Sequence, residues 1–328
     1  MNKVITFNKM IKIQDYFNIE DKVYGEGTYG VIFKGKLKKP HDSKNLDIDY
    51  AIKFFKKDEN NPALKIDYNS IYRELYLQSG LNHVGILPIS YYQILPENIG
   101  STAIVSPFMP NGSLHTLLDN ESDNIINPNW NGTKRAISIF GISAAMTYIH
   151  QKGIIHRDLK TANILLDSKM EPKICDFGLS KVFDTEIQKS GCQTMRIGTL
   201  AYMAPELIIG GGNYGFEIDV FAYSMVLYEL LTDFFPYFAQ KYDFLKFLNG
   251  ELRPNLDRKK LPEYFVNLIK KCWASDPKER PTFAQITKEM YDRWDEIFDS
   301  KIFGEDVDFD ELDDYMQRAI DGLNLPGQ

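Results

Sequence analysis

The segment of residues 156–178 constrains this chain more than any other part of the sequence. Three of its polar side chains are Asp158, Asn163 and Asp176, and an apolar stretch, residues 164–166, lies between the last two. Such a stretch separates the polar side chains and would place them on adjacent loops. We therefore expect Asp158, a proton acceptor, to lie beside two side chains whose oxygens suit a hard cation.

A second motif is the glycine-rich segment at residues 25–32, which lies between two strand-like segments. Glycine has no Cβ, so the backbone here can approach phosphate oxygens closely. A dinucleotide-binding loop would be followed by a helix, whereas residues 31–37 are strand-like. Taken alone, the pattern also fits an ordinary glycine-rich turn.

Lys53 and Glu74 come next along the chain. Lys53 lies in a strand-like stretch, residues 50–55, and Glu74 in a predicted helix near residues 69–79. Each alone would be read as a solvated surface charge. Their order after the glycine-rich segment indicates instead a phosphate-binding lysine whose position is fixed by a carboxylate.

Together and in this order, these segments resemble the eukaryotic protein kinases, specifically the serine/threonine type and the tyrosine-kinase-like group. The resemblance extends over residues 16–298 and includes residues 198–206, which resemble the end of the activation loop. It implies the α+β, bilobal protein kinase fold, with a small β-rich N-lobe containing one key helix, a larger α-helical C-lobe and an ATP cleft between them.

The resemblance also implies the domain boundaries. An N-terminal extension covers residues 1–15, and the protein kinase domain covers residues 16–298. Within that domain the N-lobe is residues 16–106, the hinge 107–110 and the C-lobe 111–298. An acidic C-terminal extension of residues 299–328 follows.

The catalytic roles follow from the same resemblance. Asp158 matches the residue that orients the substrate hydroxyl, and Lys160 matches the lysine that serine/threonine kinases place on the transferred phosphate. Asn163 and Asp176 match the metal ligands, and Lys53 matches the lysine that holds the α- and β-phosphates. The implied cofactors are ATP and Mg²⁺, with Mn²⁺ as an alternative.

The nucleotide contacts are expected in both lobes. Ile32, Ala51 and Leu165 match the residues that sandwich adenine, Ser106 matches the gatekeeper, and the Pro107 carbonyl and Met109 backbone match the hinge contacts. The remaining expected ATP-binding residues belong to the glycine-rich loop or pair with it: Gly25, Glu26, Gly27, Thr28, Gly30 and Lys53.

Several residues match regulatory positions. Glu74 and Phe177 belong to the elements that assemble in active kinases, and Arg157 matches the arginine that binds an activation-loop phosphate. Thr194 is the preferred acceptor, ahead of Ser190 and Thr185, and Thr199 matches a serine/threonine-type position. Gln78 is polar where an apolar side chain is usual, so we hypothesise a loosely held helix around Glu74.

Two framework interactions and one histidine complete the resemblance. Asp219 is expected to hold the backbone of the catalytic loop, and Arg280 is expected to pair with Glu206. His156 is expected to be a packed structural residue rather than a base.

The formal net charge of −7 resides in residues 299–328, which carry nine acidic and two basic residues. The rest of the chain is formally neutral and gives no support for a nucleic-acid-binding surface. Within this tail, apolar residues recur at helical spacing and predict an amphipathic helix: Leu312, Tyr315, Met316, Ala319 and Leu323. It is expected to dock on its own kinase domain or on a partner, and a disordered extension is the alternative.

No apolar run approaches the roughly 20 residues of a membrane span, and the first residues lack the pattern of a signal peptide. The three cysteines are few and widely spaced, which fits a reducing compartment. We therefore expect a cytoplasmic protein.

The expected function is transfer of the ATP γ-phosphate to serine or threonine hydroxyls of protein substrates. We expect phosphorylation of the activation loop to regulate this activity, and an upstream kinase or a scaffold to be a partner. Two alternatives stay open. A pseudokinase scaffold is opposed by the complete set of catalytic residues, and dual-specificity or tyrosine kinase activity is opposed by Lys160 and Thr199.

Overall fold

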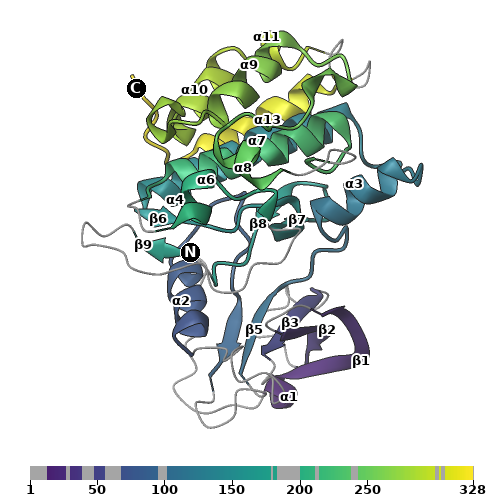
Figure 1. Ribbon diagram of the computed structural model, residues 1–328. Coiled ribbons are helices and arrows are strands. Elements are labelled where there is room, and N and C mark those ends of the chain that lie inside the picture. Colours follow the sequence, from purple (N-terminus) through teal and green to yellow (C-terminus); the bar gives the residue numbers. More distant parts are fainter. Residues whose placement is uncertain are drawn as a thin grey trace. The chain divides into compact units, whose positions relative to one another are not determined.

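The computed structural model describes residues 13–26, 30–38, 48–55, 68–94, 102–178, 180–182, 200–210, 214–237, 243–299, 303 and 307–327. The chain divides into two compact units. The N-terminal unit comprises residues 1–82 and 87–110, and the C-terminal unit comprises residues 83–86 and 111–328. Figure 1 labels the elements of both units.

The N-terminal unit is built around one antiparallel sheet with the strand order β1-β2-β3-β5-β4. Its elements are α1 (Ile13–Tyr16), β1 (Phe17–Glu26), β2 (Gly30–Leu37), β3 (Tyr50–Phe55), α2 (Tyr68–Ser79), β4 (Tyr91–Gln93) and β5 (Ala103–Pro107). The strand predicted at residues 50–55 and the helix predicted near residues 69–79 are confirmed.

The side chains of β3 and β5 alternate between the two faces of the sheet, and each face contributes to one apolar cluster. Ile52 and Val105 belong to one cluster, with Phe17 of β1. Phe55 and Ile104 belong to the other, where side chains of α2 such as Leu75 join them. Because successive residues of a strand point to opposite faces, one short sheet can contribute to both clusters.

The C-terminal unit is mainly helical. Its helices are α3 (Leu114–Ser122), α4 (Gly132–Gln151), α6 (Pro205–Ile209), α7 (Glu217–Thr232), α8 (Phe244–Leu248), α9 (Glu263–Cys272), α10 (Phe283–Asp292), α11 (Trp294–Ile297) and α13 (Phe309–Ile320). Short 3₁₀ turns are η4 (Thr161–Asn163), η5 (Leu256–Arg258) and η6 (Pro277–Glu279). Ser113 caps the start of α3, because its hydroxyl accepts a hydrogen bond from the Thr116 N–H.

Helix α4 lies at the centre of this unit. The helices α7, α10 and α13 all pack on it, and 15 of its 20 residues are buried. This explains why its sequence is apolar around most of its circumference instead of along one stripe.

Two pairs of short strands carry the polar loops of residues 156–178. Strand β6 (Ile154–Ile155) pairs with β9 (Lys181–Val182), and β7 (Ile164–Leu166) pairs with β8 (Pro172–Ile174). The apolar stretch 164–166 is thus a strand between two loops. The α+β fold class, with a β-rich N-terminal part and a helical C-terminal part, is confirmed.

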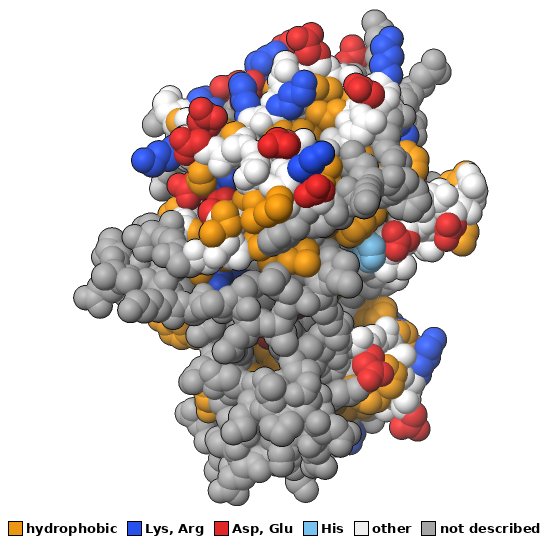
Figure 2. Space-filling view, viewed as in Figure 1, with side chains coloured by type: hydrophobic (Ala, Val, Ile, Leu, Met, Phe, Trp, Pro, Cys, Tyr) orange, Lys and Arg blue, Asp and Glu red, His pale blue; other side chains and the backbone are white. Residues whose placement is uncertain are grey.

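The acidic tail contains the helix α13, shown in yellow in Figure 1, which lies alongside α4. The five apolar positions singled out in the sequence are all buried. The charged residues of the unit are mixed in sign, and Figure 2 shows acidic and basic side chains interspersed over its visible face. Among the described residues, no helix combines the length and the apolar character that crossing a membrane requires.

Candidate active site

Three side chains of residues 156–163 meet at one carboxylate oxygen. Lys160 Nζ donates to Asp158 Oδ2 at 2.7 Å, and Asn163 Nδ2 donates to the same oxygen at 2.8 Å. Asn163 Nδ2 also lies 2.8 Å from the Asp158 carbonyl oxygen. No described residue bonds to Asp158 Oδ1 or to Asn163 Oδ1, so both oxygens remain available for other partners.

Burial raises the pKa of Asp158 above its usual value, and the neighbouring Lys160 ammonium opposes this shift. The side chain is about nine-tenths buried. A carboxylate that is partly dehydrated and held by two donors is a better proton acceptor than one in water, because less solvent must reorganise around it.

The backbone of this loop is held by Asp219 at the start of α7. Asp219 Oδ2 accepts from the His156 N–H at 2.8 Å, and Oδ1 accepts from the Arg157 N–H at 2.8 Å. His150 Nε2 lies 2.9 Å from Oδ2. Burial alone would raise the pKa of Asp219, but these hydrogen bonds outweigh burial and lower it. Arg157 has a φ of +70°, so the carboxylate stabilises an unfavourable backbone conformation. The expected role of Asp219 is confirmed.

The loop of Asp176 is linked to Asn163 through the backbone. The Cys175 N–H donates to the Asn163 carbonyl at 2.9 Å, and the β7–β8 pairing brings Ile164 opposite Ile174. Phe177 is fully buried, and its ring lies 5.0 Å from that of His156. His156 Nε2 lies 3.2 Å from the Cys175 carbonyl oxygen. His156 is therefore a packed structural residue, as expected, and Asp158, Asn163 and Asp176 lie on adjacent loops.

Lys53 and Glu74 pair within the N-terminal unit. Lys53 Nζ lies 2.9 Å from Glu74 Oε1 and 3.2 Å from Oε2. The carboxylate is buried, and the lysine extends from β3 toward α2. The two contacts with Glu74 therefore fix the position of the Lys53 ammonium group.

The expected nucleotide contacts of this unit lie on neighbouring strands. Ile32 is opposite Lys53, and Ala51 is opposite Ser106 in the sheet register. A Cβ at Gly30 would lie 2.3 Å from the Phe54 carbonyl oxygen, so only glycine fits at the start of β2. The other expected contacts are placed as follows: Gly25 and Glu26 end β1, Pro107 ends β5, Met109 follows it, and Leu165 belongs to β7 of the C-terminal unit.

Four expected site residues, Gly27, Thr28, Thr194 and Thr199, lie outside the described residues, as do Ser190 and Thr185.

Gln78 differs from its expectation. Its side chain is buried, and Nε2 donates to the Leu87 carbonyl at 2.7 Å. The polar side chain therefore ties the end of α2 to residue 87, and an apolar residue would lose this bond. The contact argues against the hypothesis that Gln78 loosens the helix of Glu74.

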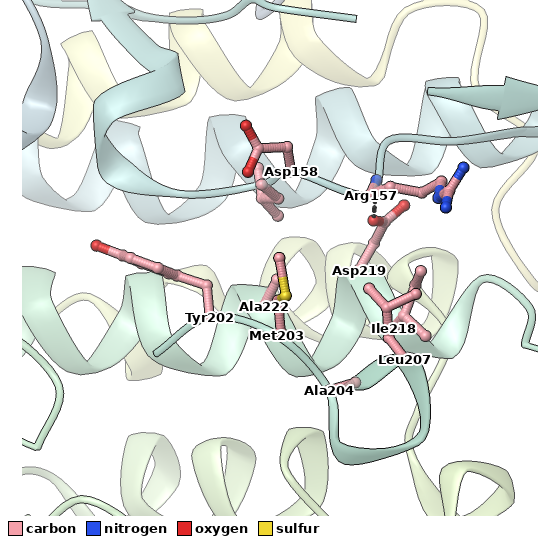
Figure 3. Close-up of a pocket in the computed structure, with 10 residues that line it drawn as sticks. Arg157, Asp158, Tyr202, Met203, Ala204, Leu207, Ile218, Asp219 and Ala222 are labelled. Carbon is pink, nitrogen blue, oxygen red and sulfur yellow. Dashed lines mark hydrogen bonds between the residues drawn. The ribbon is translucent and has the colours of Figure 1, made fainter. Parts of the chain in front are cut away.

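A small pocket lies between the catalytic loop and the segment that precedes α6 (Figure 3). Arg157 and Asp158 lie on one side of it, and Ala204 and Leu207 lie on the opposite side. The expected framework pair lies nearby in the same unit, where Arg280 forms two bonds to Glu206 at 2.5 and 3.0 Å. That expectation is confirmed.

One buried acid at this site has no counterpart among the sequence predictions. Glu229 of α7 accepts from Thr161 Oγ1 at 3.0 Å and from the Tyr202 hydroxyl, and these two hydroxyls lie 3.0 Å apart. Burial raises the pKa of Glu229 to about 8. The cluster joins the catalytic loop to the wall of the pocket. A glutamate ten residues after Asp219, within an otherwise apolar helix, was the only signal in the sequence.

The described residues contain no group of three or more His, Cys, Asp or Glu side chains that could hold a metal ion. Asn163 and Asp176 supply two oxygen-bearing side chains on linked loops. A cation that keeps several waters and also binds phosphate oxygens needs no more protein ligands than these.

The fold, the loop geometry and the ion pairs define a protein kinase domain, and a comparison of families agrees. Residues 18–291 match the protein kinase domain family, and the chain belongs to it. The predicted family is confirmed.

Individual relatives carry kinase names. A probable serine/threonine-protein kinase of Dictyostelium discoideum is 34% identical over 266 residues, which are 80% of this chain and 26% of the relative. The serine/threonine-protein kinase STY17 of Arabidopsis thaliana is 32% identical over 83% of this chain and 44% of its own length. The dual specificity protein kinase shkB of Dictyostelium discoideum is 31% identical over 83% of this chain and 39% of its own length. This chain spans less than half the length of each.

Proposed function

We propose that this chain is a protein serine/threonine kinase of the tyrosine-kinase-like group, which transfers the γ-phosphate of ATP to hydroxyl groups of protein substrates. The observation that carries the proposal is the convergence of Lys160 and Asn163 on Asp158 Oδ2. The relatives named as serine/threonine kinases support the same activity.

In the proposed reaction Asp158 accepts the proton of the substrate hydroxyl. Because Oδ2 is held by two donors, Oδ1 is the oxygen that meets the hydroxyl. A bond forms between the substrate oxygen and the γ-phosphorus, the bond from that phosphorus to the β,γ-bridging oxygen breaks, and ADP leaves. Lys160, already beside Asp158, stabilises the transferred phosphoryl group.

The proposed metal is Mg²⁺, with Mn²⁺ as the alternative. Asn163 Oδ1 and the Asp176 carboxylate would hold it, and when bound it neutralises phosphate charge. Lys53, fixed by Glu74, would hold the α- and β-phosphates of ATP. The proposed adenine contacts are those expected from the sequence, from Ile32, Ala51 and Leu165 to the backbone at Met109.

Regulation by activation-loop phosphorylation remains part of the proposal. It is supported by Arg157, whose backbone is fixed by Asp219 and whose guanidinium lies 5.3 Å from the Tyr214 ring centre. A phosphate on Thr194 would replace this weak contact with charge-assisted hydrogen bonds. Equal activity of wild type and Thr194→Ala after incubation with ATP would place the switch elsewhere.

The activity is tested with the full chain, radiolabelled ATP, Mg²⁺ and phosphoamino-acid analysis of the product. Asp158→Asn is expected to lower the transfer rate by roughly 10²- to 10⁴-fold, because the hydroxyl loses its proton acceptor. Asp123→Asn is the matched control, an exposed position after α3 in the same unit. Absence of transfer by the wild type would contradict the proposal and favour a pseudokinase scaffold.

Dual specificity is a second candidate because one relative has that name. The same experiment separates the two. Phosphoserine and phosphothreonine alone support the serine/threonine assignment, and phosphotyrosine beside them supports dual specificity.

A further inference from the structure

The tail helix α13 packs closely against α4, and the side chains of the two helices are complementary in shape. Leu312, Tyr315, Met316 and Ala319 are fully buried. The Tyr315 ring lies over Gly141 of α4, where an added Cβ would come within 2.3 Å of the hydroxyl oxygen. Glycine inside a helix costs about 1 kcal/mol relative to alanine. Because Gly141 has no side chain, it leaves the space on α4 that Tyr315 fills in this structure.

Polar contacts along the whole helix fix its position on the unit. At its start the Asp308 N–H donates to Thr133 Oγ1 at 2.7 Å, and Lys134 pairs with Glu311. Near its end Arg318 forms two bonds to the buried carboxylate of Glu171, at 2.8 and 3.3 Å. A helix held at both ends and along its apolar face has one register and one orientation.

The end of α13 bonds to a segment far away in the sequence. His83 Nε2 lies 2.7 Å from the Ala319 carbonyl oxygen, one of the last carbonyls of α13, which lack partners within the helix. The Gly85 N–H lies 3.0 Å from His83 Nδ1. Together these contacts define the tautomer, because Nε2 must carry the hydrogen that it donates while Nδ1 accepts. The ring also stacks on Tyr148 of α4 at 5.3 Å.

His83 begins the short segment of residues 83–86, which reaches the catalytic loops. A Cβ at Gly85 would lie 2.9 Å from Ala145 Cβ, so this segment runs close against α4. The Gly85 carbonyl accepts from the Ile174 N–H at 2.8 Å, at the end of β8. Ile174 is two residues before Asp176.

We propose that α13 is a positioning element of the catalytic loops of the C-terminal unit: through the bond between Ala319 and His83 it holds residues 83–86, and thereby the end of β8 before Asp176. This inference rests on the proposed kinase function for its effect on turnover. His83 and α13 touch neither the nucleotide contacts nor the reacting groups proposed above. Their action is transmitted through Gly85 and Ile174 to the loop of Asp176.

The test compares three substitutions in the full chain. His83→Phe keeps a flat ring to stack on Tyr148 but removes both the donor to Ala319 and the acceptor for the Gly85 N–H. His83→Gln offers an amide N–H in its place and is expected to restore much of the effect. Tyr315→Phe is the silent control, because the Tyr315 hydroxyl is buried and has no hydrogen-bond partner among the described residues.

Two readouts are needed, hydrogen exchange and turnover. His83→Phe is expected to speed amide exchange at the end of β8, where the Ile174 N–H bonds to Gly85, and to lower kcat/KM for ATP, each by about tenfold, which is a typical size for coupling between two sites. Exchange in α7, at the core of the same unit, is expected to stay at the wild-type rate, whereas general destabilisation would raise it as well.

The outcomes separate this inference from the proposed function. Unchanged exchange at the end of β8 in His83→Phe overturns the positioning role, whatever happens to turnover. Faster exchange in α7 by the same factor also overturns it, because the role would then be structural. A wild type that transfers no phosphate contradicts the kinase proposal, while exchange at the end of β8 still decides the role of α13.

Discussion

At the residue scale, the cluster of Glu229, Thr161 and Tyr202 depends on one proton. The three contacts within it need three hydrogens, but an ionised Glu229 leaves only the two hydroxyl hydrogens. A protonated Glu229 supplies the third. This count agrees with the pKa of about 8, which burial produces.

The cluster predicts a pH dependence of stability. An unfolded glutamate loses its proton near pH 4.5, whereas folded Glu229 keeps it to about pH 8. Between these values the folded state binds more protons, so stability falls as pH rises, by up to about 1.4 kcal/mol per pH unit. Glu229→Gln keeps a donor and an acceptor but cannot ionise, and is expected to flatten this part of the profile in urea unfolding measured from pH 5 to 8.

A wild-type profile that already runs parallel to that of Glu229→Gln would contradict this assignment.

The same cluster shows what the sequence could not reveal. Asp158, Asn163 and Asp176 are recognisable because their spacing is short and their order is fixed. Glu229, Thr161 and Tyr202 lie up to 68 residues apart, and only the packing of α7 against the catalytic loop brings them together.

At the scale of elements, the bond from Gln78 to Leu87 leads to a prediction opposite to the one that polarity alone suggests. Gln78→Leu leaves the Leu87 carbonyl without this donor in a buried place. The expected cost is roughly 1 to 3 kcal/mol of unfolding free energy, partly offset by the apolar side chain. We therefore expect lower basal kinase activity, measured on unphosphorylated protein. Higher activity than wild type would restore the view that Gln78 loosens α2.

The pair of Glu206 and Arg280 joins α6 to the turn η6. The Arg280 side chain is fully buried, and it also donates to the carbonyls of Ala274 and Glu217. Glu206→Gln leaves this guanidinium without its counter-charge, and is expected to cost about 3 kcal/mol in unfolding free energy.

The matched control for that variant is Asp292→Asn, which breaks the exposed pair with Lys288 on α10. Pairs of this kind contribute only about 0.3 to 0.5 kcal/mol. Chemical denaturation of both variants decides the matter, and equal effects would show that burial does not set the strength of the Glu206–Arg280 pair.

Spacing predicts elements better than it predicts their partners. The apolar positions of α13 were readable because they recur at helical intervals. The surface that covers these positions could not be predicted from the sequence, because α4 is buried around most of its length and shows no single apolar stripe. Gly141 was the one local hint, since a glycine inside a long helix usually has a packing reason.

At the scale of the whole molecule, the tail combines the entire formal net charge with a buried apolar face. The charge of −7 lies in residues 299–328. If charge held the tail in place, neutralising its acidic side chains would release it. If burial holds it, the apolar face is decisive, because four side chains there have no exposed surface.

Removing residues 299–328 therefore lowers the melting temperature, since α4 loses its cover of Leu312, Tyr315, Met316 and Ala319. A buried aliphatic or aromatic side chain contributes roughly 1.5 to 3 kcal/mol by leaving water, and the ordering of twelve helical residues offsets part of that sum. Asp310→Asn, at an exposed position of α13, is expected to leave the melting temperature unchanged while altering the net charge. Calorimetry of the truncated chain, Asp310→Asn and wild type side by side separates the two causes: a truncated chain that melts with the wild type would mean that the covering of α4 contributes nothing to the stability of the C-terminal unit.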